Sequence, residues 1–230
     1  MVKIMKSIKL NNLINKNEYN INSSSLEKLY TVQKEELETR NIKTYTVKEF
    51  IETIKSSKNF NLFKHTLNNI KKEYLYKSTT HGISHNERVA LYSFFLAEKL
   101  KLNKKDTLIA LYAAMYHDIG RVNDDEDRLH GFLSAKKLEQ LELDITNNDF
   151  KLLQTIITFH SINDDEFYEM IKDYKNKERI TTLFKILKDS DALDRTRLAF
   201  LDSIDLNYIR LEDSLKLVPL AYEIFYLYNK

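Results

Sequence analysis

The scarcity of helix-breaking residues constrains the fold of this chain more than any other feature. The 230 residues include three glycines and one proline, Pro219, and the pairs Asn-Gly and Asp-Gly are absent. A β-rich protein of this size would need many tight turns, and tight turns depend on these residues. The sequence therefore predicts an all-α protein, and its length suffices for one helical domain with a hydrophobic core.

Composition and charge exclude several classes of function. The net charge is +2, hydrophobic residues make up 43% of the chain, and there is no cysteine. Disulfides, thiolate zinc sites and cysteine nucleophiles are therefore excluded, and no overall field favours nucleic acid or anionic membrane as a partner. No apolar run approaches the roughly 18 residues of a membrane span, and the start lacks the apolar block of a signal peptide. We expect a cytoplasmic protein.

Capping residues and apolar periodicity predict a series of helices. Residues 1–24 lack clear periodicity and are expected to be loosely held, whereas Thr46 and Glu49 form a capping box and Thr146 is another N-cap. The helical segments predicted are 23–40, 46–55, 60–76, 85–100, 103–120, 146–161 and 178–198, with an amphipathic helical region from about residue 199.

Four of these segments carry a histidine or an aspartate on an apolar face. The residues concerned are His85, His117 with Asp118, His160, and Asp191. His85 begins the stripe Val89, Tyr92 and Leu96, and His160 and Asp191 end comparable stripes, so the side chains point into the core. Taken alone, a core histidine is usually hydrogen-bonded and a buried aspartate usually caps a helix or forms an ion pair. Together, two histidines and two buried acids satisfy one another best around a divalent cation.

The order of these residues resembles the HD-domain superfamily of metal-dependent phosphohydrolases. Three local stretches carry the resemblance: HGISHNERV, HDIGRVNDDEDRLHG and DSDALDRTRL, which together extend from His81 to Arg197. The resemblance implies an HD-domain helical bundle with extra N- and C-terminal helices. We accordingly expect an N-terminal helical extension over 1–64, and an HD domain with C-terminal helices over 65–230, in one compact unit.

The resemblance also implies roles for the matched residues. His85, His117, Asp118 and Asp191 would ligate a first metal ion. Helical phasing independently favours Asp191 over the neighbouring acid Asp189. Among the residues beside this set, Asp194 is expected to hold a ligand histidine by its other ring nitrogen, and Arg88 to form a structural ion pair.

The roles of His130 and His160 remain open between three alternatives. They could build a second metal site, contact a phosphate group, or act with Asp118 in catalysis as general acids. An acidic loop precedes His130, in which Asp124 or Asp127 could orient that histidine or a metal-bound water; a solvated loop without a role in the site is the alternative.

Basic residues near these motifs are expected to bind the substrate. The candidates for phosphate contact are Arg121, Lys188 and Arg195, together with Arg197. The function implied is hydrolysis of a phosphomonoester or phosphodiester, of nucleotide type, by a metal-activated water. The cofactor would be one or two divalent ions, and the ligand types suit Mn, Fe, Ni, Co, Zn or Mg.

Three rival functions follow from the same residues. Some HD proteins hold two irons and oxidise small molecules with dioxygen, and others sense a nucleotide without turnover. A nucleic-acid processor is disfavoured by the near-neutral charge. The aromatic C-terminus could form a homodimer, although packing on its own domain is the expected use.

The glycines lie beside histidines. Gly82 follows His81, Gly131 follows His130, and Gly120 lies three residues after His117. They are expected where the chain leaves a helix close to the site, at positions that exclude a Cβ atom or require a positive φ angle. Ordinary helix caps or turns are the alternative.

Overall fold

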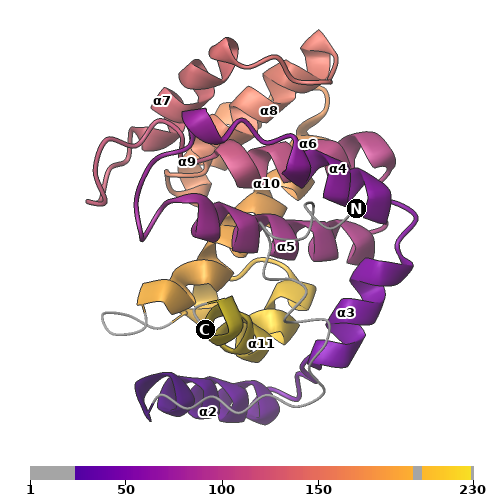
Figure 1. Ribbon diagram of the computed structural model, residues 1–230, viewed down its shortest axis with the longest axis vertical. Coiled ribbons are helices and arrows are strands. Elements are labelled where there is room, and N and C mark those ends of the chain that lie inside the picture. Colours follow the sequence, from indigo (N-terminus) through magenta and orange to yellow (C-terminus); the bar gives the residue numbers. More distant parts are fainter. Residues whose placement is uncertain (1–23, 199–203, 229–230) are drawn as a thin grey trace.

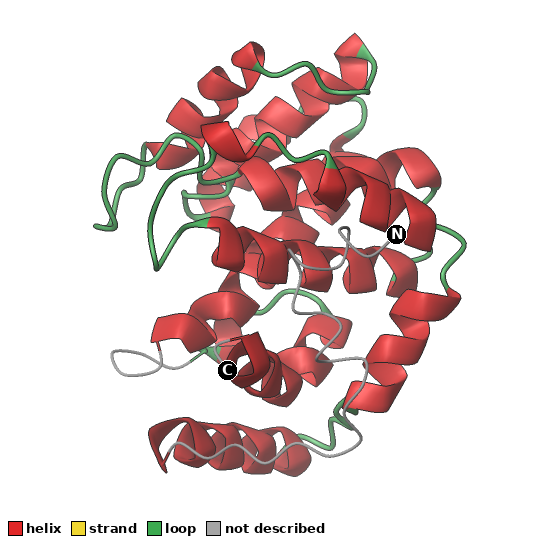
Figure 2. Cartoon of the chain, in the orientation of Figure 1, coloured by secondary structure: helices red, strands yellow, loops and turns green. Residues whose placement is uncertain are grey.

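The computed structural model describes residues 24–198 and 204–228, and over these ranges the protein is helical without any β-strand (Figures 1 and 2). The all-α prediction is thereby confirmed, while the expectation for residues 1–23 lies outside the described residues. The α-helices are α2 (Ser24–Thr39), α3 (Val47–Ser56), α4 (Phe60–Asn68), α5 (Ile83–Lys99), α6 (Lys104–Tyr116), α7 (His130–Lys137), α8 (Asn147–Phe159), α9 (Asp164–Ile171), α10 (Lys177–Leu193) and α11 (Glu212–Tyr228). Short 3₁₀ turns are η1 (Lys72–Tyr74), η2 (Leu138–Gln140), η3 (Asp194–Leu198) and η4 (Leu206–Tyr208).

Helices α5, α6 and α10 form the centre of the molecule, and Figure 1 shows α7 and α8 together at one end of it. Helix α6 is apolar nearly all round, and its residues Ile109, Leu111 and Ala114 are fully buried, as predicted for a central helix. A helix without a polar face can be stable only when neighbours cover it on every side. This burial places the last turn of α6, and the residues that follow it, deep in the protein.

Side-chain caps fix where these helices begin. Thr46 and Glu49 form the predicted capping box at α3, and the Thr146 hydroxyl accepts a hydrogen bond from the Asp149 amide at 3.2 Å at α8. The Asn103 side chain caps α6 in the same way, accepting from the Asp106 amide at 3.0 Å. Such caps satisfy amide groups that have no partner within the helix.

The terminal helices pack on this centre. Helix α2 packs against α11, and α3 packs against α5. The Tyr222 hydroxyl of α11 donates to the Gln33 side chain of α2 at 3.0 Å, and the Tyr222 side chain is fully buried. The aromatic C-terminus therefore packs on its own chain at this residue. The predicted division after residue 64 falls inside α4 and stays a prediction, as does a homodimer.

Several helix boundaries differ from the predictions. The segment predicted as one helix over 60–76 ends at Asn68, and the last predicted helix before residue 198 ends at Leu193 and continues as a 3₁₀ turn. Helices α7 and α9 were not predicted, because eight residues are too few to display an apolar period. Among the described residues, no helix is both long enough and apolar enough to span a bilayer.

Close backbone approach explains the glycines. Of the two expected reasons, exclusion of a Cβ atom is the one met, since no described glycine has a positive φ angle. A Cβ atom at Gly120 would lie 2.2 Å from the backbone nitrogen of Ser134, and one at Gly131 would lie 2.7 Å from the carbonyl oxygen of Ile157. The two glycines thus allow α7 to approach the end of α6 on one side and α8 on the other. This approach brings His130 to the other histidines.

Candidate metal centre

Six buried or half-buried side chains from five helical segments converge at the centre of the molecule. They are His85 in the first turn of α5, His117 and Asp118 after α6, His130 at the start of α7, His160 after α8, and Asp191 in the last turn of α10. All are buried except Asp191, whose side chain is 35% exposed. The cluster is therefore closed on most sides and open at Asp191.

One group, the first, consists of His85, His117, Asp118 and Asp191. His85 Nε2 lies 3.1 Å from His117 Nε2, and Asp191 Oδ1 lies 3.3 Å from the first nitrogen and 3.8 Å from the second. Asp118 Oδ2 is 3.5 Å from each of the two nitrogens. The four side chains predicted to share a metal ion are thus brought together, with their ligand atoms facing a common point.

The remaining two histidines form a second group with the other oxygen of Asp118. His130 Nε2 lies 2.9 Å from His160 Nε2, and Asp118 Oδ1 lies 3.3 Å and 3.9 Å from these two nitrogens. Asp118 therefore turns one oxygen toward each pair of histidines. Ligand atoms of His117, Asp118 and His160 lie close enough together to hold a second ion.

The hydrogen bonds of the rings determine where their protons are. Nδ1–H of His117 donates to the Ala114 carbonyl at 2.9 Å, that of His160 donates to the Ile157 carbonyl at 2.7 Å, and that of His130 donates to the Asp127 carbonyl. A carbonyl oxygen can only accept, so Nδ1 carries the proton and Nε2 presents a lone pair. The lone pairs of His130 and His160 face each other across 2.9 Å, and they repel unless a cation lies between them. Burial lowers the pKa of His85, but its hydrogen bonds to Asp118 and Asp194 outweigh burial and raise that pKa overall.

The pKa values agree with a cation-binding site. Burial lowers the pKa of His117 and of His160, and it lowers the pKa of His130 to about 4, so these imidazoles are neutral at pH 7. Burial alone would raise the pKa of Asp118 and of Asp191, but the neighbouring imidazoles lower both below the usual range. Neutral imidazoles beside ionised carboxylates are the protonation states in which these groups bind divalent metals.

Asp194 contacts the ligand histidine His85 on the ring nitrogen that faces away from the other ligands. Its carboxylate accepts a hydrogen bond from His85 Nδ1 at 2.7 Å, and Arg88 donates to it from Nε at 2.5 Å and from Nη2 at 2.9 Å. The predicted contact of Asp194 with a histidine and the predicted ion pair of Arg88 are both present. Asp189 instead accepts from the backbone amides of Arg210 and Leu211. Because these amides occupy the Asp189 carboxylate, Asp189 is not available as a metal ligand, which agrees with the prediction of Asp191 over Asp189.

The acidic loop that contains Asp124 and Asp127 does not orient His130 through either carboxylate, contrary to one expectation. Asp127 holds His130 through its backbone carbonyl and not through its carboxylate. Asp124 does not orient His130, because its Oδ1 accepts from Nδ1 of His81 at 2.8 Å and from the Ser78 hydroxyl at 2.7 Å. No role was predicted for His81, whose ring lies 5.9 Å from that of His85. The spacing of four residues between the two histidines was the available signal.

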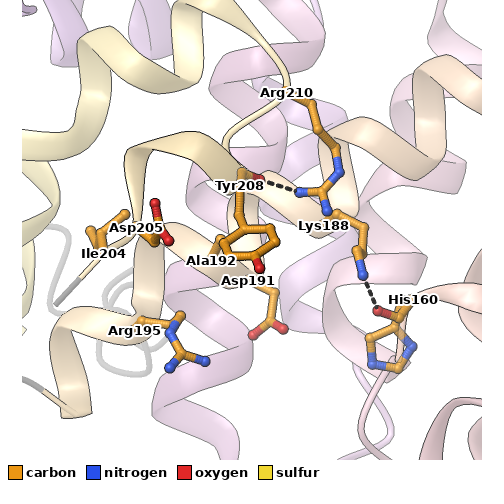
Figure 3. Close-up of a pocket in the computed structure, with 9 residues that line it drawn as sticks. All are labelled: His160, Lys188, Asp191, Ala192, Arg195, Ile204, Asp205, Tyr208 and Arg210. Carbon is orange, nitrogen blue, oxygen red and sulfur yellow. Dashed lines mark hydrogen bonds between the residues drawn. The ribbon is translucent and has the colours of Figure 1, made fainter. Parts of the chain in front are cut away.

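The predicted substrate-binding residues divide between two places. Arg121 donates from Nε to Asp118 Oδ1 at 2.8 Å, and its Nη2 lies 3.4 Å from His130 Nε2, so it lies on the second group. Lys188 and Arg195 line a pocket of about 360 Å³ that reaches Asp191 and His160 (Figure 3).

Arg197 lies beside the first group. Its side chain is 8% exposed, with Nη1 4.0 Å from Asp191 Oδ1 and 3.7 Å from Asp194 Oδ2. Within the described residues, Nε and Nη1 of Arg197 are buried without a hydrogen-bond partner. A buried guanidinium in this state offers donors to an anion at the site.

A helical bundle that converges imidazoles and carboxylates from separate helices defines a class of all-α proteins with an internal site for divalent metal ions. The model of the HD domain family matches residues 82–196, which is half of the chain, and these residues contain every member of the two groups. The chain therefore belongs to the HD domain family. No curated protein and no solved structure matches the chain.

Proposed function

We propose that this protein is a metal-dependent phosphohydrolase that acts on a small phosphate ester of nucleotide type. The observation that carries the proposal is the convergence of two pairs of histidine Nε2 atoms, 3.1 Å and 2.9 Å apart, on the two oxygens of Asp118. The buried, unprotonated Nε2 atoms of His130 and His160 would be unfavourable at this distance without a cation. Membership of the HD domain family supports the same chemistry.

The residues of the first group would hold one divalent ion: His85, His117, Asp118 and Asp191. Such an ion, when bound, acts as a Lewis acid that makes water a stronger nucleophile at neutral pH and draws charge from a phosphoryl oxygen. His130 and His160 would hold a second ion with Asp118. Their Nδ1 protons are already donated to backbone carbonyls, which favours a role as ligands over a role as general acids.

The charged side chains around Asp191 would bind the phosphate. Lys188 donates from Nζ to the carbonyls of His160 at 3.0 Å and Ile162 at 2.8 Å, and Nζ lies 3.7 Å from Asp164 Oδ1. A phosphate in the pocket would compete with Asp164 for the third proton. Arg195 lines the same pocket, and the buried Nη1 of Arg197 lies 4.0 Å from Asp191 Oδ1. These cations would offset the charge of the phosphate as its ester bond to the alcohol breaks and a bond to water forms.

The dimensions of the pocket favour a monomeric substrate. A volume of about 360 Å³ lies at the lower end of the range for small-molecule sites, and it is too small to enclose a folded nucleic acid. The net charge of +2 supplies no field that would attract a polymer of phosphates.

The proposal is tested by metal analysis of protein purified without chelator, followed by a phosphate-release screen over nucleotides and sugar phosphates. His117→Ala should lose bound metal and activity together, because His117 supplies a ligand atom both beside His85 and Asp191 and beside Asp118 and His160. The matched control is His65→Ala, since His65 is exposed on α4. Retention of both metal and activity by His117→Ala would show that the proposal is wrong.

A second candidate function is supported by the two oxygens of Asp118, each directed at a separate histidine pair. Two irons held in this way could serve an oxidation of a small molecule by dioxygen. Iron in a ratio of two per chain, with oxygen uptake and without phosphate release, would favour this function. Tight nucleotide binding without any turnover would instead indicate a sensing module.

A further inference from the structure

The outer wall of the pocket comes from a segment beyond the matched HD domain. The match ends at residue 196, whereas Ile204, Asp205, Tyr208 and Arg210 line the same pocket as Asp191 (Figure 3). The metal groups therefore belong to the family domain, and part of the substrate pocket does not. A wall of this kind can determine which substrate enters while the chemistry beneath it stays the same.

Contacts at both ends hold this wall in place. The Ile204 carbonyl accepts a hydrogen bond from the Gln33 side chain of α2. Arg210 donates to the Asp164 carboxylate at 2.6 Å and 2.7 Å, and to Asp189 from Nη1 at 3.1 Å. Helices α2, α9 and α10 thus all anchor the segment, although they lie far apart in the sequence.

Tyr208 is the exposed residue on this anchored turn. Its amide donates to the Asp205 carbonyl at 3.1 Å, and its own carbonyl accepts from Arg210 Nη1 at 2.6 Å. The residue is nevertheless 69% exposed, and Figure 3 shows its ring at the pocket next to Asp191, with Lys188 and Arg195 on either side. The backbone is fixed while the face of the ring remains available.

We propose that Tyr208 is the specificity-determining residue of the pocket, and that its ring stacks on the planar base of a nucleoside monophosphate. This inference rests on the proposed function, because the phosphate would lie at Asp191, between Lys188 and Arg195. Aromatic rings on fixed turns bind flat groups well, since few side-chain rotations are lost on binding. A phosphate ester without a base would use only the inner, charged part of the pocket.

The test compares variants of the full chain in two measurements. Steady-state KM is measured with manganese for adenosine 5′-monophosphate and for ribose 5-phosphate, which lacks the base. The dissociation constant of adenosine is measured by calorimetry, because adenosine binds without being hydrolysed. The variants are Tyr208→Ala and Tyr208→Phe. The control is Tyr174→Ala, which removes another exposed tyrosine that does not line this pocket.

Tyr208→Ala should raise the KM for the nucleotide and the dissociation constant of adenosine roughly tenfold, and should leave the KM for ribose 5-phosphate unchanged. Tyr208→Phe and Tyr174→Ala should match the wild type. No binding of adenosine by the wild type, or equal effects of Tyr208→Ala on both substrates, would overturn the inference. If adenosine binding depends on Tyr208 but no phosphate ester is hydrolysed, the inference stands and the proposed hydrolysis fails.

Discussion

Replacement of Asp194 by asparagine tests whether the site depends on support from outside the ligand set. The carboxylate is fully buried and accepts hydrogen bonds from His85 and from two nitrogens of Arg88. Asparagine keeps the shape, but it removes the negative charge and replaces one acceptor oxygen with a donor. His85 then loses the contact that orients its ring, and Arg88 loses the carboxylate that balances its charge.

Two magnitudes follow from these contacts. Removal of one partner from a buried ion pair costs about 3–5 kcal/mol of stability, and the Arg88 side chain is only 3% exposed, so solvent offers little compensation. Loss of the hydrogen bond behind a ligand histidine typically lowers metal affinity by about 10- to 100-fold. Asp194→Asn should therefore weaken both metal binding and folding.

The assays are chelator competition for metal affinity and urea unfolding, with and without metal, for stability. The matched control is Asp149→Asn, which breaks an ion pair with the partly exposed Arg179 outside the metal groups. The control should lose stability, because Asp149 is buried, but it should keep its metal affinity. Metal affinity within twofold of the wild type in Asp194→Asn would refute the argument that Asp194 positions His85.

Three further predictions concern packing, pH and metal removal. Gly120→Ala should lower the free energy of unfolding by about 1–3 kcal/mol, because its Cβ would lie 2.2 Å from the Ser134 backbone nitrogen and force α7 away. An unchanged melting temperature would contradict this. The hydrogen bond from Arg179 lowers the pKa of Asp149 below its ordinary value of 3.8. The contribution of the Asp149 carboxylate to stability is therefore present above pH 3.8 and is lost as the pH falls through the lower pKa of the folded state. Between pH 5 and pH 2.5, the free energy of urea unfolding should fall less in Asp149→Asn than in the wild type. Treatment with EDTA should lower the melting temperature, and manganese at about 100 times its dissociation constant should restore about 2.7 kcal/mol; scanning calorimetry that detects no difference would contradict a metal centre.

Local patterns account for what could be predicted about the fold. The apolar periods and caps of the long helices are visible within ten to twenty residues, so α5, α6, α8 and α10 were anticipated. The short helices α7 and α9 were not, because they are stabilised by packing and not by a period of their own. The exclusion of a Cβ atom at Gly120 was anticipated, but the neighbour that excludes it, Ser134 of α7, was not.

The residues of the candidate site likewise fall into those that the sequence could identify and those that it could not. His85, His117, Asp118 and Asp191 could be identified together because each continues an apolar stripe or lies within a motif of the HD domain. The arrangement of the second group could not, since the direction of each oxygen of Asp118 depends on how α7 and α8 pack against α6. Nor could the pairing of His81 with Asp124, which joins residues 43 positions apart.

The sequence by itself determined an all-helical chain and the side chains that can bind a metal, because helix formation and residue chemistry are local properties. Only the tertiary structure decided that Asp118 faces two histidine pairs and that Tyr208 stands over the pocket near Asp191. Those facts depend on long-range contacts, such as that between Arg210 and Asp164, whose geometry no local pattern specifies.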